Sequence, residues 1–266
     1  MKLAVKVLCL ILLSTSLPSI SWAQINSLSE AINESGRLRM LSQRMAKAHL
    51  LIGMDIRPEK ATQQLKDSQA KFEQNLIDLD TYADTSTQKH ALTLVKQQWR
   101  EYKALLDEAP SKDKVLNILN ASDATLTACE ALVQQFEQAS KTRSAALVNI
   151  SGRQRMLSQR IGKLYTSLAW SGIQPDQEAA LNQAISEFED ALVKLQQSPD
   201  NTAEVSAKLN KVMSQWQFSK AGFRTLKDGQ GTPFVISMTT ESILKKMNEI
   251  THLYQEIDLQ KILASS

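Results

Sequence analysis

The chain has 266 residues but only 8 glycines and 6 prolines, and aromatic residues make up 5% of it. Because β-sandwiches and β-barrels need many turn residues, this composition argues against both and favours a mostly helical protein. Hydrophobic residues make up 42% of the chain and the formal net charge is +3, which excludes a disordered chain and gives no support for binding to nucleic acid.

The N-terminus has the features of a secretory signal peptide. Residues 1–6 carry two lysines and no acidic residue, an apolar run follows over residues 7–13, and small residues stand at positions 21 and 23. The apolar run is much shorter than the ~20 residues of a membrane-spanning helix, and Cys9 lies inside it rather than at a lipoprotein cleavage point. We therefore predict a signal peptide over residues 1–23, cleaved after Ala23, and a periplasmic mature protein.

The chain contains an internal repeat. The segment Ser35–Arg44 recurs as Ser151–Arg160, with nine of ten positions identical at an offset of 116 residues. We call each ten-residue copy the box. The same register, within one residue, pairs Phe72 with Phe188, Leu76 with Leu192, and Trp99 with Trp216.

Three breaks divide each repeat into four segments with apolar residues at helical spacing. The breaks correspond between the repeats: residues 53–58 with 172–175, residues 81–86 with 198–202, and Pro110 with residues 229–233. Four amphipathic helices joined by short loops are typical of a four-helix bundle. The sequence therefore predicts an all-α protein of two tandem antiparallel four-helix bundle units related by internal duplication, over residues 24–140 and 141–266.

The junction between the two repeats leaves two alternatives open. No glycine or proline lies between Pro110 and Gly152, so the last helix of the first unit could continue into the second unit. Such a helix would have about 60 residues and a length of ~90 Å, which is far above the usual range. A turn near residues 139–146 is the alternative, and only a turn lets the two boxes meet inside one chain.

The box forms a helix face of small residues around one arginine, opposite its apolar face. This arginine is Arg39 in the first copy and Arg155 in the second. Because small side chains let two helices approach closely, we predict that this face packs against another box helix and that the two arginines meet at the seam. The predicted seam residues are Ser35, Gly36, Ala46, Ser151, Gly152 and Gly162.

Paired arginines at a seam need a counter-ion. Two guanidinium groups ~4 Å apart repel by about 4 kcal/mol at an effective dielectric constant of 20. No aspartate or glutamate lies on this face in either copy, so we expect an anion from outside, which draws together helices that repulsion holds apart. The alternative is a structural ion pair between each arginine and a carboxylate from another helix. The planar fork of arginine matches a planar oxyanion. Either additional hydrogen bonds to the ligand or a role as interface filler is expected for Ser42, Ser158, Gln43 and Gln159.

Residues 32–44 and 148–160 resemble the P-box of bacterial nitrate/nitrite sensor histidine kinases. They are also similar to the PilJ-type N-terminal domain of type IV pili methyl-accepting chemotaxis transducers. The resemblance implies a periplasmic four-helix bundle that dimerises, with nitrate bound between the first helices by the arginine that follows Gly-x-x. That arginine corresponds to Arg39 and Arg155, so two boxes in one chain imply a fused pseudo-dimer.

From these features we predict a sensor-type protein that binds nitrate or nitrite without catalysis and relays occupancy to a membrane partner, as a monomeric pseudo-dimer or a homodimer. One alternative is a structural adaptor that uses the boxes only as a dimer seam. Another is a binder of a different small anion, such as a carboxylate. No cofactor is expected and no catalytic set is present, and the three histidines lack the spacing of a metal site. Structural roles are expected for Arg37, Arg44, Arg153 and Arg160.

Overall fold

The computed structural model describes residues 25–140, 142–172, 174–224 and 232–265. The predicted signal peptide, residues 1–23, lies outside the described residues. The described part of the chain is helical and contains no strand. Its helices are α1 (Leu28–Gly53), α2 (Pro58–Tyr82), α3 (Ser86–Leu106), the short 3₁₀ helix η1 (Lys112–Lys114), α4 (Val115–Ala139), α5 (Arg143–Ser171), α6 (Pro175–Gln196), α7 (Ala203–Arg224) and α8 (Pro233–Ser265).

The helix ends follow local sequence signals. The Ser27 side chain caps α1 by accepting a hydrogen bond from the backbone N–H of Glu30, and Thr85 forms a capping box with Gln88 at the start of α3. Proline stands in the first turn of α2 and of α6, where its missing N–H costs nothing. These signals recur in both repeats, so each repeat folds into four α-helices, as predicted.

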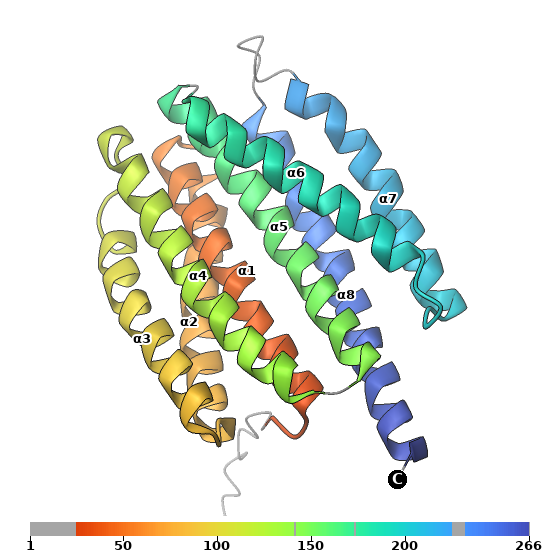
Figure 1. The fold of residues 1–266 in the computed structure, drawn as a ribbon. Helices are drawn as coiled ribbons and strands as arrows, with labels where there is room; N and C mark the ends of the chain where they lie inside the picture. The colour runs from red at the N-terminus through yellow and green to blue at the C-terminus, as the bar shows by residue number, and fades with distance from the viewer. Residues whose placement is uncertain (1–24, 141, 173, 225–231, 266) are drawn as a thin grey trace, which may run out of the picture.

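The two box helices, α1 and α5, lie at the centre of the molecule. Figure 1 shows them side by side and running in the same direction. Helices α2 and α4 pack against α1, and α3 packs against α4; in the second repeat, α6 and α8 pack against α5, and α7 packs against α8. The fold is therefore two antiparallel four-helix units joined along their first helices.

A turn connects the two units. Helix α4 ends at Ala139 and α5 begins at Arg143, with an extended backbone at Ser140 and Thr142. Of the two alternatives for the junction, the turn is the one found in the structure, and the 60-residue helix is excluded. Because the turn reverses the chain direction, α5 returns alongside α1 and brings the second box to the first (Figure 1).

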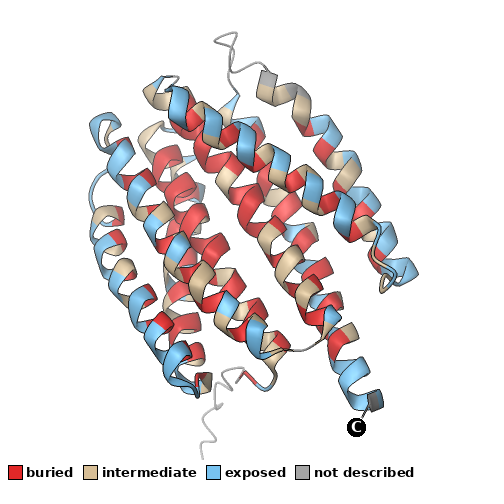
Figure 2. Cartoon of the chain, in the orientation of Figure 1, coloured by how far each residue is buried: buried red, intermediate tan, exposed pale blue. Residues whose placement is uncertain are grey.

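The aromatic core confirms the register of the duplication. The rings of Phe72 and Trp99 lie 4.5 Å apart between centroids, and those of Phe188 and Trp216 lie 4.3 Å apart. One hydrophobic cluster runs through both units without interruption. The outer helices alternate between buried and exposed faces, whereas α1 and α5 are buried along most of their length (Figure 2). None of the described helices combines the length and hydrophobicity required to cross a membrane.

Candidate anion-binding site

The seam between α1 and α5 brings the two predicted arginines together inside one chain. The side chains of Arg39 and Arg155 are both fully buried. A methyl group placed on Gly36 would lie 3.1 Å from Nη2 of Arg39 and 3.7 Å from Nη2 of Arg155. One placed on Gly152 would lie 3.2 Å from Nη2 of Arg155 and 3.5 Å from Nη2 of Arg39. The two guanidinium groups therefore converge on the same small space, which the two glycines leave open.

Arg39 has a carboxylate partner from another helix. Its Nη1 donates to Oε2 of Glu130 on α4 at 2.7 Å, and its Nη2 donates to Oδ1 of Asn149 on α5 at 2.8 Å. The expectation that the counter-ion comes only from outside the protein is therefore wrong for Arg39. For Arg39 the structure has the alternative, an ion pair with a carboxylate from another helix, and the spacing of residues along one helix does not reveal which acid supplies it.

Arg155 has the same hydrogen-bonding geometry without a carboxylate. Its Nη1 donates to Oδ1 of Asn248 on α8 at 2.9 Å, and its Nη2 donates to Oδ1 of Asn33 on α1 at 2.7 Å. Burial and the charge of Arg37 lower the pKa of Arg155 to about 9, although Glu34 acts in the opposite direction. Arg155 is therefore a buried cation whose hydrogen-bond acceptors, among the described residues, are all neutral oxygens.

The Nε–H group of each arginine has no acceptor. The Nε atoms of Arg39 and Arg155 are buried and find no hydrogen-bond partner within the part of the chain that the structure describes. A buried N–H of a charged group without an acceptor is costly. The seam thus holds two cations, two Nε–H groups without an acceptor and one directly bound carboxylate.

Asn33 and Asn149 are site residues that the sequence reasoning missed. They lie at the 116-residue offset of the repeat, two positions before the ten-residue box, so their recurrence in segments 32–44 and 148–160 was the signal that could have identified them. Each crosses the seam: Asn33 on α1 reaches Arg155, and Asn149 on α5 reaches Arg39. Hydrogen bonds tie the two units together here, so the helices are not held apart by repulsion.

The predicted serines do not direct their hydroxyls at the arginines. Ser42 donates to the carbonyl of Arg39 at 2.8 Å, and Ser158 donates to the carbonyl of Arg155 at 2.7 Å. Ser35 and Ser151 bond in the same way to their own helices. These four buried hydroxyls satisfy helix carbonyls, so their main contribution to the seam is their small size.

The two glutamines lie beside the serines and attach the box to the last helix of each unit. Gln43 donates to the carbonyl of Ser122 on α4 at 3.1 Å, and Gln159 donates to the carbonyl of Thr240 on α8 at 3.1 Å. The Oε1 atom of Gln159 accepts from Lys47 at 2.6 Å, whereas Oε1 of Gln43 has no partner among the described residues. The glutamines therefore connect the box to its surroundings, and their hydrogen bonds among the described residues do not include Arg39 or Arg155.

Besides the arginine pair, the interface between the units contains a second charged layer, which was not predicted from the sequence. It surrounds two fully buried lysines. Lys47 on α1 pairs with Glu241 on α8 at 2.6 Å, and Lys163 on α5 pairs with Asp123 on α4 at 2.7 Å. Burial lowers the pKa of Lys163 to about 8, against the attraction of Asp123. Each ion pair joins a box helix of one unit to the last helix of the other unit.

Among the seam residues, Gly162 makes room for this layer. A methyl group there would lie 2.9 Å from both Cδ of Lys47 and Oγ1 of Thr240. Ala46, its counterpart two residues after the first box, is fully buried. The remaining box arginines make ion pairs: Arg37 with Glu34, Arg44 with Glu241, Arg153 with Glu187 and Glu130, and Arg160 with Asp123.

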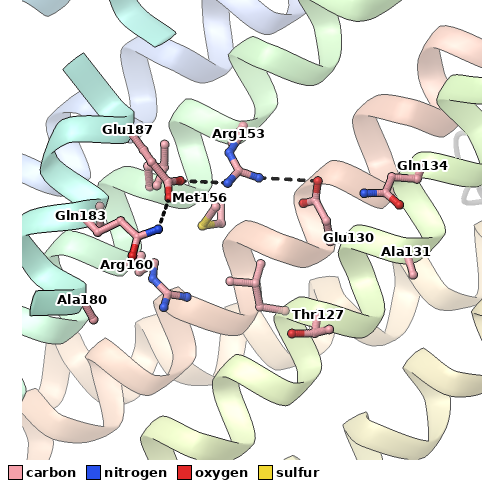
Figure 3. A pocket seen from close by; sticks show the side chains of 13 residues that line it. Thr127, Glu130, Ala131, Gln134, Arg153, Met156, Arg160, Ala180, Gln183 and Glu187 are labelled. Atoms are coloured by element: carbon pink, nitrogen blue, oxygen red, sulfur yellow. Dashed lines mark hydrogen bonds and ion pairs between the residues drawn. The ribbon is translucent and has the colours of Figure 1, made fainter. Parts of the chain in front are cut away.

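Glu130 also faces an open groove. The groove has a volume of about 440 Å³ and runs between α4, α5 and α6. Figure 3 shows Arg153 between Glu130 and Glu187, at 3.5 Å and 2.8 Å respectively. The Glu130 side chain is 26% exposed, so it connects the buried Arg39 to the solvent-filled groove.

The comparison with known families agrees with the duplication. The model of the family described as PilJ, Type IV pili methyl-accepting chemotaxis transducer N-term, matches residues 20–125 and again residues 136–237. The two matches cover most of the chain, and each contains one box. No curated protein and no solved structure gives a significant match to the chain.

Proposed function

The chain belongs to the PilJ family, as a tandem pair of these transducer N-terminal domains, and from this premise we propose that it is a periplasmic sensory protein that binds nitrate or nitrite between Arg39 and Arg155. The occupancy of this site is relayed to a membrane partner, as expected for a domain type found at the N-terminus of chemotaxis transducers. The protein does not catalyse a reaction. The family is one of sensory domains rather than of enzymes, which supports this part of the proposal.

The excess of positive charge at the seam carries the proposal. Two fully buried guanidinium groups converge over Gly36 and Gly152, and Glu130 is the one carboxylate within hydrogen-bond distance of them among the described residues. The bonds from arginine to the asparagine oxygens are charge-assisted through the donor alone, whereas an anion adds a direct Coulomb attraction between opposite charges. A planar oxyanion would therefore bind more strongly to the arginine fork than the asparagine oxygens that now contact it.

Occupancy would change the contact between the two units. Asn33 and Asn149 each hold an arginine of the opposite unit, so an anion that displaces one of these asparagines removes a hydrogen bond across the seam. The anion replaces that bond with its own bonds to the guanidinium group. The relative position of α1 and α5 then depends on the ligand, because the ligand binds more strongly to one arrangement than to the other.

The hydrogen bonds of the arginines also favour a second candidate, a structural adaptor. Every Nη atom of Arg39 and Arg155 already has a protein acceptor, as in a seam that serves only to hold the two units together. A third candidate is a sensor for another small anion, because a guanidinium pair also binds carboxylates. These candidates make different predictions for the same titration.

Isothermal titration calorimetry with sodium nitrate and sodium nitrite tests the proposal. The protein is expressed with its own N-terminus and purified from the periplasmic fraction. The double variant Arg39→Lys/Arg155→Lys keeps both charges but removes the planar fork, so we expect nitrate affinity to fall at least about tenfold. The control variant Arg100→Lys changes an exposed arginine of α3 and leaves binding intact.

Titrations with sodium chloride, sulfate and acetate define the ligand class. Binding of acetate but not of nitrate would replace the proposed ligand by a carboxylate. No heat and no shift in melting temperature with any of these anions would reject the sensor and support the adaptor. Circular dichroism of each variant shows that the helices are intact before the affinities are compared.

A further inference from the structure

The last helices of the two units differ in charge where they meet the arginines. Glu130 and Glu137 on α4 lie 118 positions before Asn248 and Gln255 on α8. The same offset relates Ser122 to Thr240, which accept the equivalent bonds from Gln43 and Gln159. The first unit therefore places two carboxylates where the second unit places two amides.

The first difference acts on the arginines directly. Nη1 of Arg39 lies 2.7 Å from Oε2 of Glu130, and Nη1 of Arg155 lies 2.9 Å from Oδ1 of Asn248. The same guanidinium atom thus meets a negative oxygen in one half of the seam and a neutral oxygen in the other half. An incoming anion must displace a carboxylate at Arg39, but only an amide at Arg155.

The second difference acts on the asparagines that cross the seam. Asn149, which contacts Arg39, donates its amide to the carboxylate of Glu137 at 2.6 Å. Asn33, which contacts Arg155, donates its amide to the neutral oxygen of Gln255 at 2.6 Å. A charged acceptor holds its donor more strongly than a neutral one, so Asn33 is easier to displace than Asn149.

Among the described residues, the acid that acts on Arg155 is Glu34, and it compensates for these differences only in part. The carboxylate of Glu34 acts on Arg155 electrostatically, but it forms its ion pair with Arg37 at 3.1 Å and lies 3.9 Å from Lys71. The depressed pKa of Arg155 has burial as its largest cause, followed by the positive charge of Arg37. An anion at Arg155 therefore gains more than an anion at Arg39, where a carboxylate is already in place.

We propose that the duplicated site is one-sided, so that each chain binds one external oxyanion at Arg155 while Glu130 occupies Arg39 as a built-in anion. This inference rests on the proposed function and specifies which half of the seam carries it. Glu130 prevents an external anion from binding at Arg39. The contacts of Arg39 therefore stay the same when the ligand binds, and the contacts of Arg155 change.

Two isosteric substitutions test the assignment. Asn248→Asp places a carboxylate beside Arg155, in imitation of Glu130, and Glu130→Gln removes the carboxylate from Arg39. In nitrate titrations we expect the wild-type chain to bind one anion, Asn248→Asp to bind at least about tenfold more weakly, and Glu130→Gln to bind a second anion. Gln260→Glu adds the same charge at an exposed position of α8 and serves as the matched control.

Single arginine variants provide an independent measurement. Arg155→Lys should remove most of the nitrate affinity of the wild-type chain, whereas Arg39→Lys should reduce it much less. Two anions per wild-type chain, equal losses in the two arginine variants, or unchanged binding by Asn248→Asp would each overturn the one-sided site. No nitrate binding by the wild-type chain and by Glu130→Gln would instead reject the proposed function itself.

Discussion

Arg155 donates a hydrogen bond at 2.7 Å to the side chain of Asn33, and this bond joins the second repeat to the first. The symmetric bond runs from Arg39 to Asn149 at 2.8 Å. A site formed by two copies of one sequence therefore lies inside a single chain. The four side chains that make these two bonds come from both box helices, so neither repeat forms the seam by itself.

The oligomeric state follows from this arrangement. Because α1 and α5 of one chain already pack against each other along the box face, no second chain is needed to complete the arginine pair. We expect the purified protein to have the mass of a single processed chain in size-exclusion chromatography with light scattering. A dimer that persists on dilution into the nanomolar range would contradict this expectation.

The N-terminus is open to a direct test. Residues 1–23 have the pattern of a signal peptide, and we expect the periplasmic protein to begin at Gln24. Intact-mass spectrometry of the purified protein measures this. A mass that includes residues 1–23 would disprove the cleavage.

The paired aromatic residues predict equal losses of stability in the two units. Phe72→Ala and Phe188→Ala each remove a fully buried ring that stacks on a tryptophan, so each should lower the free energy of unfolding by about 3–5 kcal/mol. Urea denaturation followed by circular dichroism measures the change. Because one hydrophobic core spans both units, both variants should unfold in a single transition. Two separate transitions would show that the units are independent.

Gly162→Ala should destabilise the seam. The added methyl group would lie 2.9 Å from Cδ of Lys47, and this side chain cannot move aside easily because its Nζ is bound to Gln159 and Glu241. Overpacking of this kind costs about 1–3 kcal/mol, which is measurable as a lower midpoint of urea denaturation. The control is Lys66→Ala on the exposed face of α2, which should change stability by less than about 0.5 kcal/mol.

The second charged layer predicts a loss of stability in acid. Although burial by itself raises the pKa of the Glu241 carboxyl group, Lys47 and Arg44 lower it to about 2. A carboxyl group with a lowered pKa in the folded state stabilises the protein at neutral pH. This contribution, at most about 3 kcal/mol, is lost as the pH falls from about 4.5 to about 2.

Comparison with Glu241→Gln isolates this contribution. The variant should be less stable than the wild-type chain at pH 7, because it leaves the buried Lys47 without its counter-ion. The difference between the two proteins should shrink as the pH approaches 2. Urea denaturation at pH 7, 4 and 2.5 measures it, and a difference that stays constant with pH would rule out the role given to Glu241.

The repeated box explains why the arginine pair could be predicted. Nine identical positions at one offset imply that Arg39 and Arg155 occupy equivalent positions on their helices, and the small residues around them imply a close neighbour. It was harder to predict which helix packs against the box. The chain between Pro110 and Gly152 contains neither glycine nor proline, so the sequence allowed both a turn and a continuous helix at the junction of the two units. The turn around residues 140–142 depends on the Thr142 cap and on the packing of α5 against α1.

By itself, the sequence determined the helical class, the duplication and which two arginines meet at the seam. Helical periodicity and an internal repeat can both be identified from the order of residues along the chain. Only the tertiary structure decided what surrounds those arginines. Glu130, Asn248 and the lysine partners come from helices that are distant in sequence, and their distances depend on how eight helices pack. The charge difference between the two halves of the seam is therefore a property of the packing, since neither box contains it.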